Sequence, residues 1–581
     1  MNHATDAVSP PSPAETRPPR AAATLVVVRD ADVAAAAASP GIEVLLSRRA
    51  ERGDHNSGAW VFPGGVVDPG DHLAQDLCEQ LDDAAASARL GLPEGGLAYY
   101  AAAVRECFEE SGLLYATDRA GAMLRLDDAV GAQLAAWRGP LHRGERTLAE
   151  LCAEFGLTLA LDRLIYLSHW CTPPARAKRF DTRFFIAAVP PAQAAAHDGT
   201  ELVEQRWLRP ADALARAHEL KLLTPTQKTL ETLARFDTVA ALLAWAGGPR
   251  EVGLTQPRVA TGSAGMRPVI PDEPAYDELG RLDPAGLGTA SYELLPGVAV
   301  RLSPRLIRVT ANNGSMMTGP GTNTYLVGGG AANEWAVIDP GPADDAHIDA
   351  ILAAAPGPIR WIFVTHTHKD HSPATVALQA RTGAQVHGRI ADHPQWQDLS
   401  FAPDTHLQGG ERFTLPGPDG EASTLLAVHT PGHASNHLCY LLEEEKLLFT
   451  GDHVMQASTV VINPPDGDMA AYIASLLELC KIGEGDLAWL APGHGFLMAR
   501  PQRAMLAIVA HRLKREAKVF GAVRALGPAS AEALLATVYA DVPERLHAMA
   551  LRSLTAHLFK LRDEAIVVEA DGRWSLPVGS A

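Results

Sequence analysis

Seven side chains that can bind a metal occur in a tight order in the second half of the chain. The first four fall within six residues, and the other three follow separately at turns that contain glycine. They are His366, His368, Asp370, His371, His433, Asp452 and His494. Imidazole nitrogens and carboxylate oxygens are the ligands that a borderline divalent metal such as zinc takes. Seven donors are enough for two adjacent metal ions, which can activate water at neutral pH and stabilise an oxyanion.

Each group of donors directly follows a short apolar stretch that reads as a buried strand. These stretches are residues 360–365, 424–428, 446–450 and 487–490. Strands that deliver ligands from loops at one sheet edge give a rigid site with an open face. Glycines in these loops would permit the tight backbone turns that such a site needs. They are Gly432, Gly451, Gly493 and Gly495.

This order of donors resembles the metallo-β-lactamase superfamily, whose fold is an αββα sandwich with a two-metal site. The resemblance implies one metal on His366, His368 and His433. It implies a second metal on Asp370, His371 and His494, with Asp452 as the bridge and Asp370 also as a catalytic residue. We therefore expect an enzyme that hydrolyses an ester, thioester, lactone or phosphodiester with two zinc ions. Iron and manganese are the alternative metals.

The C-terminal tail carries a weak positive charge. Residues 511–581 contain ten Arg or Lys and eight Asp or Glu, a net charge of +2, and Arg512, Lys514, Arg515 and Lys518 fall on one predicted helix. Two helical stretches and a hairpin-like piece at 565–576 follow. Segments 313–325 and 431–437 resemble the superfamily branch of glyoxalase II-like and lactamase-like endoribonuclease members, and the tail resembles the winged helix of that branch. Some relatives act on RNA, but a charge of +2 favours a solvated helix face together with a lid or dimer contact over the metal site.

Three carboxylates are expected on one face of a helix in the first half. Glu106, Glu109 and Glu110 stand at positions i, i+3 and i+4, and Gly112 is expected to end the helix. Carboxylates this close repel one another, and a hard cation such as Mg²⁺ or Mn²⁺ would compensate. Arg105 lies four residues before Glu109 and could orient it.

Together with the segment 60–65, Trp-Val-Phe-Pro-Gly-Gly, this helix resembles the Nudix box, whose family hydrolyses diphosphates linked to another moiety. Two features depart from it. Asp71 replaces the usual glutamate, and 33 residues (72–104) separate it from Arg105. The split box resembles a branch that includes peroxisomal coenzyme A diphosphatases, as do segments 172–174, 179–185 and 223–227. We expect Asp71 to reach Arg105 less well than glutamate would. An active site would bind Mg²⁺ through Glu109 and Glu110 with help from Glu106 and use both for catalysis; a ligand-sensing domain is the alternative.

Composition and the positions of segments rich in glycine and proline predict the domain boundaries. A chain of 581 residues with 47% hydrophobic and 20% charged residues is expected to form several α/β domains. We predict a disordered N-terminus (1–20), a Nudix α/β/α sandwich (21–243), a connector (244–298), a metallo-β-lactamase αββα sandwich (299–505) and a small winged-helix-like domain (506–581). A net charge of −18 argues against general polyanion binding. Six cysteines without a C-x-x-C pair, and no membrane-length apolar run, predict a reduced, cytoplasmic protein.

The sequence therefore predicts a bifunctional metal-dependent hydrolase that acts on a small-molecule phosphoanhydride or thioester. Acyl-coenzyme A carries both bonds, so each half could cut one bond of the same molecule. The alternative is an RNA-processing endoribonuclease, with the Nudix half acting on nucleotides or serving as a sensor. The sequence leaves the oligomeric state open.

Overall fold

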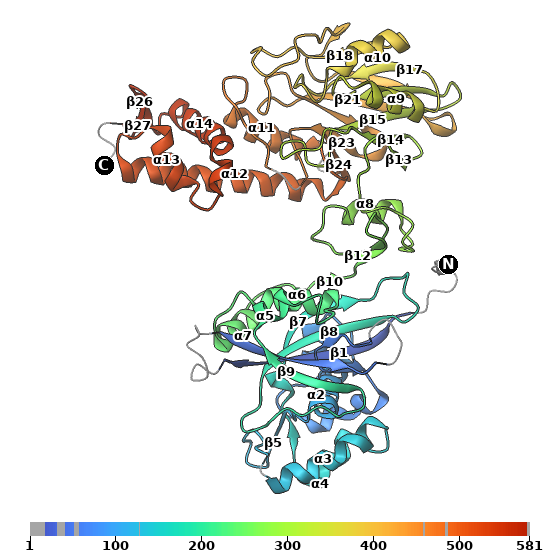
Figure 1. Cartoon of the computed structure of the whole chain (residues 1–581), viewed down its shortest axis with the longest axis vertical. Coiled ribbons are helices and arrows are strands. Elements are labelled where there is room, and N and C mark those ends of the chain that lie inside the picture. Colours follow the sequence, from blue (N-terminus) through green and yellow to red (C-terminus); the bar gives the residue numbers. More distant parts are fainter. Residues whose placement is uncertain are drawn as a thin grey trace, which may run out of the picture. The chain divides into compact units, whose positions relative to one another are not determined.

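The computed structural model describes residues 18–31, 41–51, 57–126, 128–456, 459–482 and 486–577. The chain forms two compact units (Figure 1). Most of the predicted disordered N-terminus lies outside the described residues, as does the alanine run at 34–38, and the first strand begins at Arg20. All six cysteines are free thiols. Within the described part of the chain, no helix combines the length and the apolar character needed to cross a membrane.

The N-terminal unit is built on an eight-stranded mixed sheet. Six strands follow one another across the sheet in the order β10 (Leu254–Thr255), β7 (Ile165–Cys171), β8 (Phe180–Ala188), β1 (Arg20–Asp30), β2 (Ile42–Arg49) and β3 (Trp60–Val61). Two more strands pair beside this path: β4 (Gly64–Val66) with β1, and β9 (Leu202–Leu208) with β2. Central strand β1 is apolar along nearly its whole length because both faces of the sheet are covered. Leu25 and Val27 face one core and Val26 and Val28 the other, as a period of two requires.

Helices cover both faces, which confirms the α/β/α sandwich. Helix α2 (Gly96–Ser111) packs on one face, and α6 (Thr224–Leu233) and α7 (Val239–Gly247) on the other. Gly112 ends α2 at φ 73°, in the left-handed conformation that glycine adopts without strain. The remaining elements are η3 (Pro69–Leu77), α1 (Asp83–Leu90), β5 (Ala116–Thr117), α3 (Asp128–His142), α4 (Leu148–Phe155), β6 (Thr158–Leu159), η4 (Leu161–Arg163) and α5 (Pro210–Ala215).

Two sheets packed face to face form the body of the C-terminal unit. One runs β13 (Ala299–Ser303), β14 (Leu306–Thr310), β15 (Asn323–Gly329), β16 (Glu334–Ile338), β17 (Ile359–Phe363), β18 (Gln385–Gly388) and β19 (Thr405–His406). The other runs β20 (Arg412–Pro416), β21 (Ala422–His429), β22 (Leu438–Leu442), β23 (Leu447–Gly451), β24 (Trp489–Pro492) and β25 (Met498–Ala499). Tyr325 and Phe363 from one sheet meet Tyr440 and Phe449 from the other in a shared core.

Helices close the outer faces of this sandwich. Helices α9 (Asp345–Ala354) and α10 (Ala374–Thr382) cover the first sheet, and α11 (Met469–Leu479) covers the second (Figure 1). The predicted αββα architecture is therefore confirmed. Short 3₁₀ turns occur at η5 (Pro418–Gly420) and η6 (Glu443–Glu445).

A small helical domain with its own core ends the chain. It comprises α12 (Pro501–Leu526), α13 (Ala531–Val538), η8 (Glu544–Leu546), α14 (His547–Asp563) and the hairpin β26 (Val568–Ala570) and β27 (Arg573–Ser575). The predicted hairpin is present, and its turn residues Asp571 and Gly572 both have positive φ, as a two-residue hairpin turn requires. Helix α12 begins before residue 506, so it links the sandwich directly to this domain.

The segment expected to be a connector, with packing against its neighbours as one possibility, is built into the two units. Residues 244–298 contain β10, β11 (Arg258–Ala260), β12 (Arg267–Val269) and α8 (Tyr276–Leu282), and they are divided between the two units. Helix α8 belongs to the C-terminal unit. Its buried Glu278 accepts two hydrogen bonds from Arg308, at 2.6 and 2.8 Å, and a third from the backbone N–H of Leu497 at 2.7 Å. The many glycines and prolines of this segment indicate a connector. They do not reveal ion pairs with residues distant in sequence, such as the one between Glu278 and Arg308.

Candidate functional site

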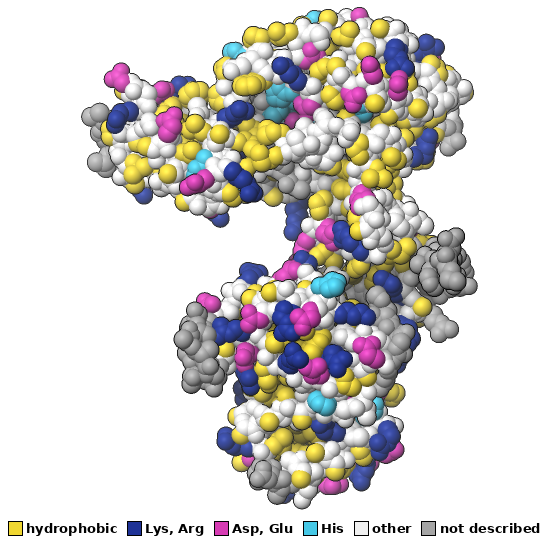
Figure 2. All heavy atoms as spheres, in the orientation of Figure 1, with side chains coloured by type: hydrophobic (Ala, Val, Ile, Leu, Met, Phe, Trp, Pro, Cys, Tyr) yellow, Lys and Arg dark blue, Asp and Glu magenta, His cyan; other side chains and the backbone are white. Residues whose placement is uncertain are grey.

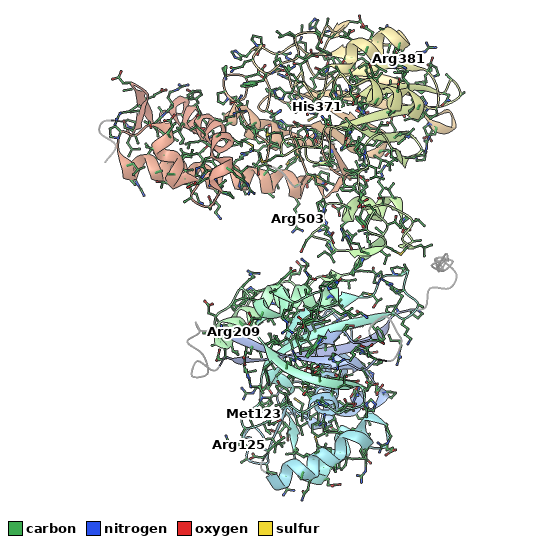
Figure 3. The ribbon with its side chains drawn as sticks, viewed as in Figure 1. Met123, Arg125, Arg209, His371, Arg381 and Arg503 are labelled. Carbon is green, nitrogen blue, oxygen red and sulfur yellow. The ribbon has the colours of Figure 1, made fainter. Side chains whose placement is uncertain are left out.

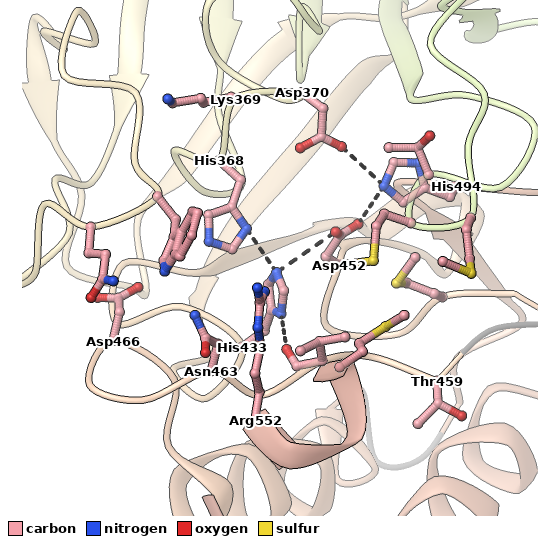
Figure 4. Close-up of a pocket in the computed structure, with 18 residues that line it drawn as sticks. His368, Lys369, Asp370, His433, Asp452, Thr459, Asn463, Asp466, His494 and Arg552 are labelled. Carbon is pink, nitrogen blue, oxygen red and sulfur yellow. Dashed lines mark hydrogen bonds and ion pairs between the residues drawn. The ribbon is translucent and has the colours of Figure 1, made fainter. Parts of the chain in front are cut away.

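The structure brings the seven predicted metal ligands of the second half together at one end of the sandwich. They form two groups, and within each group the donor atoms lie within 4.8 Å of one another: His366, His368 and His433 in one, and Asp370, His371, Asp452 and His494 in the other. The loops after β17, β21, β23 and β24 supply them, as predicted from the strand ends. Figure 3 places His371 inside this unit, and Figure 4 shows the ligands that line the pocket.

Close backbone approach makes glycine necessary at two of the turns. A Cβ atom at Gly493 would lie 2.7 Å from Cε1 of His371 and 2.8 Å from Oδ1 of Asp452. Gly451 adopts φ 42°, and a Cβ there would lie 2.5 Å from the hydroxyl oxygen of Thr365. Any side chain at these two positions would displace a predicted ligand or the residue that supports one.

Hydrogen bonds behind the histidines of the first group determine which ring nitrogen faces the centre. The hydroxyl of Thr365 donates to Asp339 at 2.7 Å, so the Nδ1–H of His366 donates to that hydroxyl at 3.0 Å. The Nδ1–H of His433 donates to the carbonyl of Val461 at 2.9 Å. In both rings Nε2 therefore carries the lone pair.

These two lone pairs converge on a third imidazole. Nε2 of His366 and Nε2 of His433 each lie 3.0 Å from Nδ1 of His368. A single proton on His368 can serve only one of them, so two nitrogen lone pairs face each other at close range. A cation bound among the three nitrogens would remove this repulsion, which is the arrangement of a three-histidine metal site.

In the second group, too, hydrogen bonds at Nδ1 orient the histidine rings, and here carboxylates lie beside them. Nδ1 of His371 donates to Asp339 at 2.9 Å, and Nδ1 of His494 donates to the carbonyl of Gly321 at 3.1 Å. Nε2 of each ring is buried and has no hydrogen-bond partner among the described residues. Both Nε2 atoms therefore face inward, and each presents a lone pair to a metal once its proton is lost.

Carboxylate oxygens lie opposite these lone pairs. Nε2 of His371 and Nε2 of His494 are each 3.3 Å from Oδ2 of Asp370, and they are 3.3 and 3.1 Å from Oδ1 of Asp452. Oδ2 of Asp452 also lies 3.8 Å from His433, so this carboxylate stands between the two groups. The donor set therefore fits two adjacent divalent metals with Asp452 as the bridge.

The pKa values of His368 in the first group and His494 in the second shift in opposite directions. Burial and the neighbouring His433 lower the pKa of His368 to about 3. Burial also acts to lower the pKa of His494, but Asp452 and Asp370 outweigh it and raise the pKa to about 9. A proton would therefore occupy the second group in the metal-free protein, and metal binding there would release it.

Asp339 is a supporting residue that the sequence analysis missed. It is buried and accepts hydrogen bonds from the backbone and the hydroxyl of Thr365 and from His371. Its position directly after the buried strand β16 is the signal that could have revealed it, because β17 and its ligands end at the same sheet edge. Three further histidines of the same loops belong to neither group: His437 and His453 are buried, and His429 is partly exposed.

A pocket of about 280 Å³ opens onto the two groups (Figure 4). Its walls include four methionines, Met316, Met317, Met455 and Met549, and further lining residues are Lys369, Trp396, Asn463, Asp466 and Arg552. Figure 2 shows histidine and acidic side chains together at the surface of this unit beside hydrophobic side chains. Met549 and Arg552 come from α14 of the small C-terminal domain, in keeping with the expected contact of the tail over the metal site, although neither residue was singled out from the sequence.

In the N-terminal unit, Arg105 of α2 lies among acidic side chains. Its Nε and Nη2 donate to both oxygens of the buried Asp71, at 3.0 and 3.1 Å, and its Nη1 donates to Glu106 and Glu109 at 3.0 and 3.3 Å. The expectation that Asp71 reaches Arg105 poorly is therefore wrong. The turn η3 carries the backbone of Asp71 to α2, so the shorter side chain still forms a two-pronged pair.

Glu106, Glu109 and Glu110 share a helix face as predicted, but they do not form a close donor group among the described residues. Glu110 instead accepts the backbone N–H of Gly64 at 2.9 Å. A Cβ at Gly65 would lie 2.3 Å from Glu106, which explains the second glycine of the motif. Burial raises the pKa of Glu106 to about 7 and raises the pKa of Glu110 well above its usual value, so a hard cation would favour the ionised carboxylates.

Three family models match the chain, in the predicted order. They are the NUDT19 Nudix domain at residues 92–236, the metallo-beta-lactamase superfamily at 317–494 and the beta-lactamase associated winged helix domain at 530–574.

Known proteins resemble each half. Lactamase-like protein vrtG of Penicillium aethiopicum is 37% identical over 197 residues, which are 33% of this chain and 58% of that protein. The atrochrysone carboxyl ACP thioesterase of Aspergillus chevalieri is 31% identical over 299 residues, covering 48% of this chain and 89% of that protein. A crystal structure of a NUDIX hydrolase from Alicyclobacillus acidocaldarius is 29% identical with a TM-score of 0.33, covering 40% of this chain and 99% of that one.

Proposed function

The chain belongs to the metallo-β-lactamase superfamily, with a Nudix domain before the lactamase domain and a winged helix after it, and from this premise we propose that it is a bifunctional hydrolase of acyl-thioesters and diphosphates. Its C-terminal half hydrolyses a thioester at a two-metal site. Its N-terminal half hydrolyses a diphosphate with Mg²⁺. Acyl-coenzyme A, which contains both bonds, is the substrate class that unites the two halves.

One observation carries this proposal: inward-facing imidazole nitrogens converge at two adjacent points beside one pocket. Nε2 of His366 and His433 converge at one point, and Nε2 of His371 and His494 at the other. When bound, two divalent metals would supply a water nucleophile ionised near neutral pH and positive charge for the developing oxyanion.

The chain's own residues hold this site rigid. Asp339 and Thr365 fix the orientation of His366 and His371 from behind. The hydroxyl of Thr322 donates to Asp370 at 3.2 Å and orients this carboxylate toward the pocket. Such fixed supports keep ligands within the narrow geometry that catalysis needs.

A thioester suits the remaining pocket chemistry. A leaving thiolate has an ordinary pKa of about 8.5, so it can depart at neutral pH without a proton from the protein. Among the described lining residues outside the two metal groups, the only carboxylate is Asp466, and it accepts hydrogen bonds from Gln397 and Ser435. A thioesterase also appears among the curated relatives, at 31% identity over 89% of its length.

In the N-terminal half we assign Mg²⁺ binding to Glu109 and Glu110 with help from Glu106. Arg105 would hold Glu109 in place while it is itself fixed by Asp71. The reach of Asp71 removes the main departure from the Nudix pattern, so we favour an active site over a ligand-sensing domain.

Mass spectrometry of the products from acyl-coenzyme A and Mg²⁺ tests both activities. We expect free coenzyme A from the C-terminal half and adenosine 3′,5′-bisphosphate from the N-terminal half. His368→Ala should abolish only the first product, and Glu109→Gln only the second.

Exposed residues outside both sites provide matched controls. His393→Ala and Glu94→Gln should leave both products unchanged. Loss of both products in either active-site variant would contradict two independent sites. If the wild-type chain forms neither product but cleaves single-stranded RNA in a His368-dependent manner, the thioester proposal is wrong.

A further inference from the structure

The C-terminal domain contributes directly to the pocket over the two metal groups. Met549 and Arg552 lie one turn apart on α14, so their side chains share a helix face. Both line the pocket together with His368, His433 and Asp452 (Figure 4).

Arg552 has no acidic partner among the described residues. It is exposed, and its guanidinium lies 5.3 Å from the ring centroid of Trp396. A guanidinium held over an aromatic ring by a cation–π contact keeps its N–H donors, which lie in its own plane, available to a ligand. Arg552 is therefore positioned at the pocket with its charge unneutralised by the described part of the protein.

Trp396 itself adopts an unusual backbone conformation. Its φ is 72°, in the left-handed region that bulky residues rarely adopt. The ring nevertheless remains 53% exposed at the pocket, so burial of the tryptophan does not explain the conformation. Strained residues of this kind tend to occur at ligand sites.

A second cation lines the same pocket. Lys369 is exposed between the predicted ligands His368 and Asp370, and it too forms no ion pair within the described residues. The remaining carboxylate of the lining, Asp466, accepts hydrogen bonds from Ser435 and Gln397. The pocket thus combines two free cations with a flexible apolar wall of four methionines.

We propose that Arg552 and Lys369 bind an anionic group of the substrate, which makes the winged-helix domain part of the substrate site. This inference rests on the proposed thioesterase activity and deepens it, because it assigns the substrate class: thioesters that carry an anionic group. A carboxylate on the acyl group and a phosphate on the thiol carrier share this chemistry.

Steady-state kinetics on four thioesters distinguish the two sources. Glutaryl and pentanoyl groups have the same chain length, but only glutaryl carries a carboxylate. Each is presented on coenzyme A, which carries phosphates, and on N-acetylcysteamine, which carries none. Pentanoyl-N-acetylcysteamine is therefore the neutral reference.

We expect Arg552→Met to lower kcat/KM for the anionic substrates about tenfold relative to the neutral reference, mainly through KM, since one ion pair of moderate strength is worth about a factor of ten. Arg552→Lys should restore most of the loss. A loss confined to glutaryl esters assigns the acyl carboxylate, and a loss confined to coenzyme A esters assigns the carrier phosphate.

Arg545→Met is the matched control, because Arg545 is exposed just before α14 and does not line the pocket. It should leave the ratio of anionic to neutral substrates unchanged. An unchanged ratio in Arg552→Met, or a change equal to that of Arg545→Met, would overturn the inference. Failure of the wild-type chain to hydrolyse any of the four esters would instead overturn the proposed thioesterase activity, and the inference with it.

Discussion

His347 is one of several buried histidines that make the C-terminal unit sensitive to acid. His347 is 3% exposed, and its Nε2 lies 2.9 Å from the hydroxyl of Thr324. Burial lowers its pKa to about 4, whereas an unfolded histidine titrates at about 6.5. Between these values the unfolded chain binds a proton that the folded chain does not, so the free energy of unfolding should fall by up to about 1.4 kcal/mol per pH unit as the pH drops.

Urea denaturation at several pH values from 7 to 4 measures this dependence. The variant His347→Asn should show a shallower loss of stability than wild type below pH 6.5. His406→Asn changes an exposed histidine and should leave the slope unchanged. Equal slopes in wild type and His347→Asn would contradict the assignment.

Individual residues show what a sequence can and cannot predict about the site. The seven donors could be predicted because spacing and turn glycines are local features of the chain. The hydrogen bonds between Asp71 and Arg105 could not be predicted, because they depend on how a spacer of 33 residues folds back onto α2. A contact of the tail over the metal site could be expected, but Arg552 itself could not be singled out, because which residues of α14 line the pocket depends on how the domain packs.

At the scale of elements, α8 is held to the sandwich by a buried ion pair. Glu278 and Arg308 each have side chains 2% exposed. We expect Glu278→Gln to lower the free energy of unfolding of the C-terminal unit by about 3–5 kcal/mol, because it leaves a buried guanidinium without its charged partner. Urea denaturation followed by tryptophan fluorescence would measure the loss.

Two further variants test the cause. The double variant Glu278→Leu with Arg308→Met should recover much of the stability, since replacing both members of a buried pair with apolar residues is often neutral. Glu334→Gln removes the exposed partner of Arg360 and should cost less than about 1 kcal/mol. If Glu278→Gln costs no more than Glu334→Gln, the pair does not hold α8.

The strands that carry the ligands were predictable as elements, whereas α8 was not. Apolar runs before each ligand group match β17, β21, β23 and β24 closely, because buried strands are apolar along their length. Helix α8 is short and mostly polar on its surface, and its stability comes from Arg308 and Leu497, which are distant in sequence.

For the whole molecule, two compact units predict two separable responses to metals. In thermal unfolding of chelator-treated protein, Zn²⁺ should raise the melting temperature of one transition and Mg²⁺ that of the other. An ion at 100 times its dissociation constant stabilises the folded state by about 2.7 kcal/mol. Differential scanning calorimetry measures both shifts.

The active-site variants assign each transition. His368→Ala should remove the response to Zn²⁺ alone, and Glu109→Gln should reduce the response to Mg²⁺ alone. His393→Ala should preserve both responses. A shift of both transitions by either ion, unchanged in these variants, would contradict the assignment of metals to the two halves.

The order of domains could be predicted from motifs alone, and the three family models match in that order. The boundary between the two halves could not, because it is set by the tertiary contacts of a segment rich in glycine and proline. Residues 260–265 and 272–284 belong to the C-terminal unit, whereas 266–271 and 285–288 belong to the N-terminal one.

This interleaving bears on how such a fusion can arise and be taken apart. A recombination breakpoint placed before this segment would strip the N-terminal unit of residues 266–271, and one placed after it would strip the C-terminal unit of α8 and leave Arg308 without Glu278. No single breakpoint in the segment yields two intact products. A chimaera joined at either place should therefore contain one unit that lacks part of its own contacts.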